Sequence, residues 1–241
     1  MMTQRFPLDR SALLLYLALI ATACAGNSTG KLPPSALPAG MAPATAEQVA
    51  AYVAAGAPEG NRQLRFKFKF KDPKGKVGGR GAARIAAPDS LRLDMQGPFG
   101  LGKGAAMVNG DSTEWIKGPE AIRRIVPDFR LMWSMLGFTR PPPEGAVLSA
   151  SESGDVTAWS YATAADTVEY VRTGGATPSL IALVRKDGAV LGRSETFYGP
   201  DGAPTKSQLI VPGTSARLDL TFTESTTPAT FKPDTWVRGE S

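Results

Sequence analysis

Side chains able to do covalent or acid–base chemistry are scarce in this chain. Among its 241 residues there is no histidine and a single cysteine, Cys24. This composition excludes histidine-based triads, imidazole general bases, zinc sites with imidazole ligands and internal disulfides. Carboxylates alone could support hydrolysis, but no spacing pairs them in one site: Asp89, Asp94, Glu152, Asp155 and Asp166. We therefore expect no enzymatic activity and no cofactor.

Two short motifs match catalytic or nucleotide-binding patterns only in part. Ser28 and Lys31 have the spacing of a serine nucleophile with a lysine base, but their segment has no pattern that would build a rigid pocket. The segment 97–103 approaches a phosphate loop, yet Gly104 stands where a magnesium-binding Ser or Thr is needed. We interpret both matches as chance.

The thiol of Cys24 has a clear chemical context. Arg5 and Arg10 precede an apolar run over residues 12–20, and the small residues 21–23 lead to the cysteine. This pattern is typical of an export signal, and the run is shorter than the roughly 18 to 20 residues that cross a bilayer. We therefore predict a signal peptide over residues 1–23.

The sequence Ala-Thr-Ala-Cys resembles the bacterial lipoprotein box, in which the cysteine is acylated and becomes the first residue of the mature chain. A lone cysteine in an exported protein has no disulfide partner, which favours lipidation of Cys24. Ordinary cleavage after Ala23 is the alternative, because the box usually has Leu where this chain has Ala21. Residues 24–44, rich in Pro, Ala, Gly, Ser and Thr, are interpreted as a lipidated N-terminus with a tether.

A folded domain is predicted over residues 45–241. Thr45 begins a capping box before a short helix to about residue 57. Residues 63–71 then alternate strictly between polar and apolar side chains, which predicts a strand with one apolar and one charged face. Further strands are expected over residues 80–87, 91–95, 105–108, 113–116, 156–161, 167–172, 179–185, 190–198, 206–211 and 217–223. Turn pairs such as Asn109-Gly110 and Asp187-Gly188 favour one meandering antiparallel sheet.

One helical, strongly apolar segment interrupts the strands. It covers residues 119–126 and 128–138, with Asp128 as a helix cap and the prolines 141–143 as its end. Because apolar residues occupy nearly its whole circumference, the second helix must be buried against the apolar face of the sheet. The expected fold class is therefore α+β, a curved antiparallel sheet that forms an unclosed half β-barrel with a helical lid.

Three segments resemble the outer-membrane lipoprotein receptor (LolB-type) of the lipoprotein-localisation pathway: residues 80–94, the motif Gly-Pro-Phe-Gly at 97–100, and Phe129-x-x-x-Trp133-x-x-Leu136-Gly137. The resemblance spans about residues 45–140. It implies a LolA/LolB-like fold in which an unclosed barrel holds acyl chains, and a receptor that is itself anchored as a lipoprotein on the periplasmic face of the outer membrane.

The resemblance implies an apolar cavity that binds acyl chains of lipoproteins or lipids and helps to localise them to the outer membrane. We expect its lining from ten side chains on the strands and on the lid: Leu64, Phe66, Phe68, Phe70, Leu91, Leu93, Met95, Met132, Trp133 and Leu136. The alternative is that the same side chains fill a closed core, which would make the protein a structural or accessory envelope lipoprotein.

Two surface features have open interpretations. Phe99 and Leu101 stand among glycines in a loop that either contacts the bilayer or cargo during transfer or folds back over the barrel mouth. Lys67, Lys69, Lys71 and Arg65 form a cationic stripe, which suits anionic head groups but is more typical of a solvated strand face.

The expected partners are acylated lipoproteins or lipids, a periplasmic lipoprotein carrier, and the membrane through the N-terminal anchor. The formal net charge of +5 is a mild bias on a chain of this size. Export makes a nucleic-acid partner unexpected, and we expect a monomer.

Overall fold

The chain divides into Met1–Lys31, which lies outside the described residues, and one compact unit, Leu32–Ser241. The computed structural model describes residues 35–86, 88–98, 102–110, 112–118, 120, 123 and 125–236, all in this unit. The expected signal peptide, Cys24 and the loop residues Phe99 and Leu101 lie outside the described residues.

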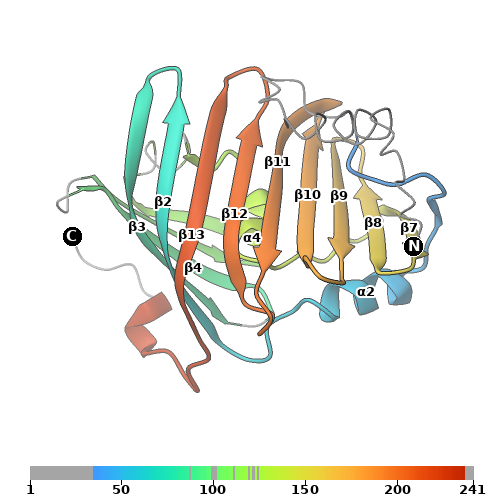
Figure 1. Ribbon diagram of the computed structural model, residues 1–241, viewed down its shortest axis with the longest axis horizontal. Helices are drawn as coiled ribbons and strands as arrows, with labels where there is room; N and C mark the ends of the chain where they lie inside the picture. The colour runs from blue at the N-terminus through green and yellow to red at the C-terminus, as the bar shows by residue number, and fades with distance from the viewer. Residues whose placement is uncertain are drawn as a thin grey trace, which may run out of the picture. The chain divides into compact units, whose positions relative to one another are not determined.

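The unit Leu32–Ser241 is built on one antiparallel sheet of 13 strands (Figure 1). The strands are β1 (Ala42–Pro43), β2 (Arg62–Asp72), β3 (Gly75–Ala86), β4 (Ser90–Gln96), β5 (Lys103–Asn109), β6 (Ser112–Lys117), β7 (Val147–Ser153), β8 (Val156–Ala162), β9 (Asp166–Thr173), β10 (Ser179–Lys186), β11 (Ala189–Tyr198), β12 (Pro204–Val211) and β13 (Ala216–Thr226). This confirms the predicted fold class, an unclosed and curled antiparallel sheet with helices.

Two meanders share this sheet. Strands β2 to β6 follow one another, as do β7 to β13, and pairing of β13 with β2 joins the two halves. The strand order ends at β1 on one side and at β6 on the other, so among the described strands the barrel is not closed. The connection from β6 to β7 consequently has to cross the sheet from one edge region to the other.

This connection carries helix α4 (Phe129–Met135), capped by the Asp128 side chain as predicted. The helix is shorter than the expected 128–138, because Gly137 adopts a φ of +94° that ends it. Of the helix expected over 119–126, several residues lie outside the described part of the chain. Helix α2 (Ala46–Ala54) begins at the Thr45 cap, and a short 3₁₀ helix, η2 (Pro233–Trp236), follows the last strand.

Every strand predicted from the sequence is present, and two further strands were not predicted. Strand β7 is rich in Ser, has one buried residue, Ala150, and pairs on one side only with the two residues of β1, so it has no apolar alternation to detect. Strand β1 has only two residues, which pair with Ala150 and Ser149 of β7.

The segment 35–44 lies against the domain, although the sequence analysis assigned it to the tether. The Glu169 carboxylate accepts hydrogen bonds from the Ser35 hydroxyl (2.9 Å) and the Ala36 amide (2.7 Å) and also pairs with Arg185. Together with β1, these contacts hold the end of the expected tether to β7 and β9. Pairing through backbone and hydroxyl groups leaves no hydrophobic pattern, which is why the composition did not reveal it.

Candidate functional site

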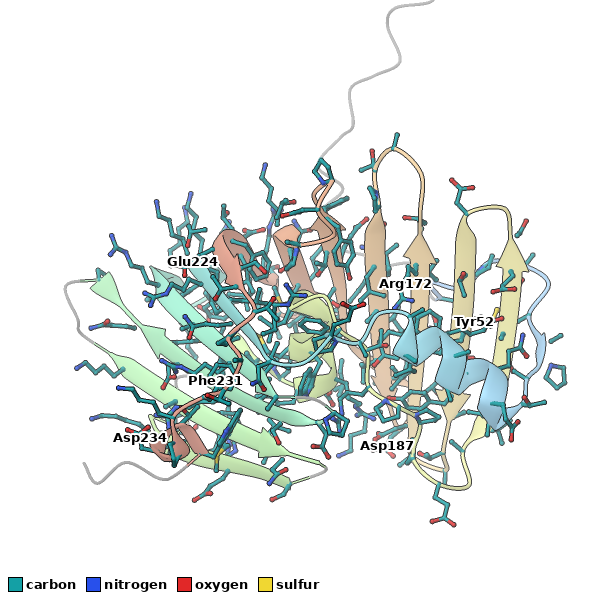
Figure 2. All side chains as sticks on the ribbon, turned by 90° about the horizontal axis from the view of Figure 1, so that it is seen from below. Tyr52, Arg172, Asp187, Glu224, Phe231 and Asp234 are labelled. Carbon is teal, nitrogen blue, oxygen red and sulfur yellow. The ribbon has the colours of Figure 1, made fainter. Side chains whose placement is uncertain are left out.

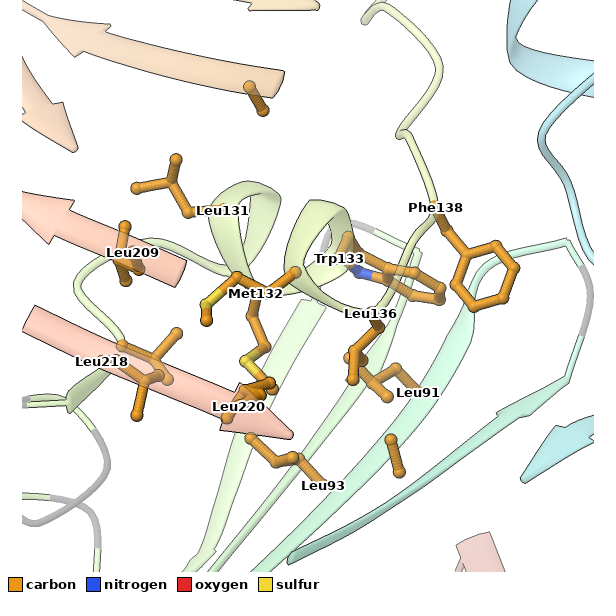
Figure 3. Packing of buried hydrophobic residues seen from close by; sticks show 14 of the residues in the cluster. Leu91, Leu93, Leu131, Met132, Trp133, Leu136, Phe138, Leu209, Leu218 and Leu220 are labelled. Carbon is orange, nitrogen blue, oxygen red and sulfur yellow. The ribbon is translucent and has the colours of Figure 1, made fainter. Parts of the chain in front are cut away.

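Helix α4 lies over the apolar face of the sheet and contacts β10, β11 and β12. In Figure 3, Met132 points toward Leu218 and Leu220, while Leu136 lies beside Leu91. The two leucines at 218 and 220 belong to β13, and Leu91 belongs to the other meander. One helix therefore joins the inner faces of both halves of the sheet.

All ten side chains expected to line a cavity are in one buried hydrophobic cluster. Their exposed fractions run from 0% for residues such as Leu64 and Met132 to 5% for Met95. The sheet residues face inward as the alternation predicted, and the α4 residues pack on them. Helix α4 therefore covers this part of the inner face.

Strand β11 presents an unusual row to the helix. Beside apolar residues of β10 and β12 such as Leu180, Val184 and Leu209, β11 offers Gly192, Ser194, Thr196 and Tyr198 at every second position. A Cβ at Gly192 would lie 2.8 Å from a methyl carbon of Leu131, so glycine allows the close approach of the helix. Hydroxyls at the next positions make hydrogen bonds instead of apolar contacts.

Three hydroxyl contacts link this row to α4 and to the residues that follow it. The Ser194 and Ser134 hydroxyls lie 2.5 Å apart, and the Thr196 hydroxyl donates to the Ser134 carbonyl over 2.8 Å. The Tyr198 hydroxyl donates to the Gly137 carbonyl, also over 2.8 Å. Ser134, Ser194 and Thr196 are fully buried, so water does not compete for these bonds.

An ion-pair network holds the start of α4. Arg130 contacts Asp128 (2.7 Å) on its own helix cap and Asp166 (2.9 Å) on β9. Burial acts to lower the pKa of Arg130, but the hydrogen bonds and charges of Asp128 and Asp166 outweigh it and hold that pKa above its ordinary value. The guanidinium therefore stays charged and fastens the helix to the sheet.

A cleft of about 770 Å³ opens beside the end of α4. We call it the end cleft; it is lined by Leu136, Gly137 and Phe138, by the end of α2, and by the loops after β9 and β11. Its volume lies within the range of about 300 to 1,000 Å³ typical of small-molecule sites.

Arg172 is a half-buried cation of the end cleft. Its guanidinium donates to the Tyr52 carbonyl in the last turn of α2 (3.0 Å) and lies over the Trp159 ring at 5.2 Å. Figure 2 labels Arg172 and Tyr52. A Cβ at Gly56 would lie 2.0 Å from the Arg172 Nη2 atom, so this glycine leaves room for the guanidinium. Burial lowers the pKa of Arg172, and no carboxylate pairs with it among the described residues.

A second cleft, of about 890 Å³, lies on the other side of the helix. It joins residues of β6 and β8, which stand near opposite ends of the strand order, and we call it the seam cleft. Trp115 packs on Phe129 with ring centroids 5.4 Å apart, and Arg140 lies 5.3 Å from the Trp133 ring. Aromatic rings and cations together make this cleft amphipathic.

Three tyrosines near these clefts are shielded from water. Burial raises the pKa of Tyr198 to about 12 and raises the pKa values of Tyr161 and Tyr170 as well. All three phenols are therefore neutral hydrogen-bonding groups at physiological pH.

Sequence reasoning missed the residues that hold α4 in place. Ser194 and Thr196 were assigned to a strand, but nothing marked their hydroxyls as helix contacts. The missed signal was a break in the apolar alternation of β11, where Gly192, Ser194 and Thr196 occupy inward positions. Arg172 gave no signal, because an arginine on a strand usually faces water.

Among the described residues, no helix has the length and apolar character required to cross a bilayer.

No protein-family model and no curated protein matches the chain. Solved structures do resemble it at low identity. A LolA superfamily protein from Nitrosomonas europaea is 10% identical, with a TM-score of 0.38, covering 79% of this chain and 96% of that chain. An outer membrane lipoprotein-sorting protein domain from Vibrio parahaemolyticus is 11% identical, with a TM-score of 0.40, covering 79% and 97%.

MucB, in its complex with the periplasmic part of MucA, is 14% identical to this chain. The TM-score is 0.33, and the match covers 81% of this chain and 60% of MucB. These values describe similarity of fold, and the LolB-type resemblance stays a prediction.

Proposed function

We propose that this protein binds acyl chains of lipoproteins or lipids between the curled sheet and helix α4, and that it helps to localise them to the outer membrane. One observation carries the proposal: a single short helix, borne on the connection between the two meanders, covers the apolar inner face of an unclosed sheet. A helix attached in this way can leave the sheet without breaking any strand pairing.

Free energy explains why acylated cargo needs such a carrier. A triacylated lipoprotein has about 45 chain carbons, and each methylene favours an apolar environment by about 0.8 kcal/mol. The total is tens of kcal/mol, so the chains cannot cross water unaided. A carrier therefore has to offer an apolar site close in free energy to the membrane and release the chain by exchange.

The contacts of α4 suit reversible opening. Its polar bonds to Ser194 and Thr196 and the Arg130–Asp166 pair can be exchanged for bonds to water when the helix moves. Met132 and Met135 are unbranched and repack around chains of different length with little strain. The end cleft and the seam cleft flank the helix and would admit the first part of a chain.

We further propose that Cys24 is acylated and anchors the protein to the periplasmic face of the outer membrane, where it receives cargo from a periplasmic carrier. The export pattern and the position of the lone cysteine support this placement.

A structural envelope lipoprotein without cargo is the second candidate. The observation that favours it is the complete burial of the inner face: Leu64, Leu91, Leu93, Met132 and Leu136 each have 0% exposure. A closed core of this kind needs no ligand for its stability.

Uptake of a fluorescent fatty acid and of a fluorescent diacylated lipopeptide by the full chain separates the two functions. Saturable uptake, together with lipids retained after gentle purification and identified by mass spectrometry, is the result expected of a carrier. A folded protein that retains no lipid and takes up neither probe would be the structural module instead.

A further inference from the structure

The outer face of the N-terminal meander (β2 to β6) carries a second concave surface, whose lining includes only Phe66 and Met95 of the ten residues expected to contact acyl chains. It is a groove of about 850 Å³ across β2, β3, β4, β5 and β6. Its lining contains six cationic residues: Arg65, Lys67, Arg80, Arg92, Lys103 and Lys117. We call it the cationic groove.

Strand register explains why these cations meet. Arg65 on β2 lies in one row with Ala82, Asp94, Ala105 and Lys117 on the next four strands. The small alanines between long side chains form the hollow. The cations come from segments up to 52 positions apart in the chain, so the groove exists only once the sheet has formed (117 − 65 = 52).

A second row adds more positive charge. It runs from Lys67 through Arg80 and Gln96 to Lys103. On the other side of Lys67 it continues through Thr221 to Lys206 of β12. The stripe of lysines noted on β2 therefore lies within a cationic field that spans several strands.

The acidic residues in and beside the groove already form ion pairs with arginines. Asp94 is the only carboxylate of its described lining, and it pairs with Arg84 (2.7 Å) and Arg92 (3.2 Å). Arg65 pairs with Glu224 at 3.3 Å. Within the described part of the chain, Lys67, Arg80, Lys103 and Lys117 have no ion pair, and all four are exposed.

The C-terminal segment borders the groove without covering it. The Arg92 guanidinium donates to the Thr235 carbonyl over 2.9 Å, and Phe231 packs against Trp236 with centroids 5.7 Å apart. Figure 2 shows Phe231 and Asp234 beside the strands of this meander. Arg92 is part of the groove lining, whereas Phe231, Asp234, Thr235 and Trp236 are not.

We propose that the cationic groove docks the protein on an anionic bilayer through the phosphates of lipid head groups. Long, exposed lysines with unpaired charge suit a surface of phosphates, because each needs only proximity and no fixed geometry. A protein partner fits less well, since protein interfaces are depleted in lysine and enriched in aromatic residues, whereas the described lining of this groove has three lysines and a single aromatic residue, the buried Phe66. This docking is independent of acyl-chain binding.

Vesicle cosedimentation tests the proposal. The full chain carrying Cys24→Ser, which has no acyl anchor, is mixed with vesicles of phosphatidylcholine alone or of phosphatidylcholine with phosphatidylglycerol. We expect stronger binding to the anionic vesicles, and weaker binding as salt rises. Adding Lys103→Gln and Lys117→Gln should weaken anionic binding about 25-fold in low salt, because each surface cation contributes about a fivefold factor.

A matched pair of substitutions controls for total charge. Lys74→Gln and Lys186→Gln remove two exposed lysines outside the groove, and binding should change less than about twofold. Equal losses in both pairs, or equal binding to both kinds of vesicle, would overturn the proposal. Binding of an acidic polypeptide in place of anionic vesicles would also overturn it. Fatty-acid uptake by the variant with Lys103→Gln and Lys117→Gln should be unchanged. A loss of vesicle binding can then be distinguished from a loss of acyl-chain binding.

Discussion

The hydroxyl oxygens of Ser134 on α4 and Ser194 on β11 lie 2.5 Å apart in a site closed to water. Each hydroxyl has one proton to donate. Ser134 donates its proton to the Leu131 carbonyl (2.8 Å), so Ser194 is the donor of the bond between the two serines. The helix lid is thus held to the sheet by a directional bond from β11.

Ser194→Ala removes this donor and leaves Ser134 bonded only within its helix. We expect the free energy of unfolding in urea to fall by about 1 kcal/mol. Ser207→Ala is the matched control, because Ser207 is buried on the neighbouring strand β12 and its hydroxyl has no hydrogen-bond partner among the described residues. That variant should be neutral or slightly more stable, and equal losses in both variants would contradict a specific role of the serine pair.

A disulfide in place of the serine pair should lock the lid. The 2.5 Å separation of the two oxygens is compatible with the about 2.05 Å length of an S–S bond, given the longer bonds from carbon to sulfur. In a Cys24→Ser background, we expect Ser134→Cys with Ser194→Cys to block fatty-acid uptake when oxidised and to restore it when reduced. Each single cysteine variant serves as a control. Uptake that continues through a verified disulfide would show that α4 is not the lid.

The Arg130–Asp166 pair should oppose opening from the other end of the helix. Asp166→Asn is expected to reduce the free energy of unfolding by up to about 1 kcal/mol, less at high salt, because both partners are partly exposed. It should also speed fatty-acid uptake, measured by stopped-flow fluorescence. Glu195→Gln breaks the comparable Arg193–Glu195 pair on β11 and should leave the uptake rate unchanged.

Alkaline pH should lower the free energy of unfolding through ionisation of Tyr198. Burial raises the pKa of this phenol from 10.0 to about 12, so between these values the unfolded chain releases a proton that the folded chain retains. The stabilisation is complete below pH 10.0 and is lost as pH rises toward 12. Urea unfolding across this range should show a smaller alkaline loss for Tyr198→Phe than for the parent. An identical slope in both proteins would mean that Tyr198 does not titrate in this window.

Lipidation of Cys24 has a direct measurement. In a bacterial host with the lipoprotein pathway, the parent chain should have an intact mass that includes acyl groups and should fractionate with the outer membrane. Cys24→Ser should lose that added mass and move to the soluble periplasmic fraction. A parent protein that is cleaved after Ala23 and carries no acyl group would leave ordinary secretion as the correct interpretation.

Local pattern was sufficient for most elements of the fold. The alternation of residues 63–71 predicted β2 with its inward and outward faces, and Thr45 and Asp128 predicted the two helix starts. These features depend on neighbours in sequence, so the chain displays them directly. Strand β7 was not predicted, because it is rich in Ser and has a single buried residue, so its sequence shows no apolar alternation.

Of the candidate site, only the apolar residues could be predicted from the sequence. The ten predicted side chains do come together, because inward apolar residues of one curved sheet share a single interior. The polar bonds of Ser134 with Ser194 and of Arg130 with Asp166 could not be predicted. Each joins segments that lie far apart in the chain, and the local sequence of neither segment indicates the contact.

The sequence by itself predicted an export signal and an acylated Cys24, and it determined most of the strands and an apolar helix that had to be buried. Each of these is set by composition or by a period of two or 3.6 residues. Tertiary structure alone decided that the helix crosses the sheet on an edge-to-edge connection, that hydroxyls of β11 hold it, and that Lys103 and Lys117 join Lys67 in one groove. Those features arise from strand order and register, which bring distant residues together after the chain has folded.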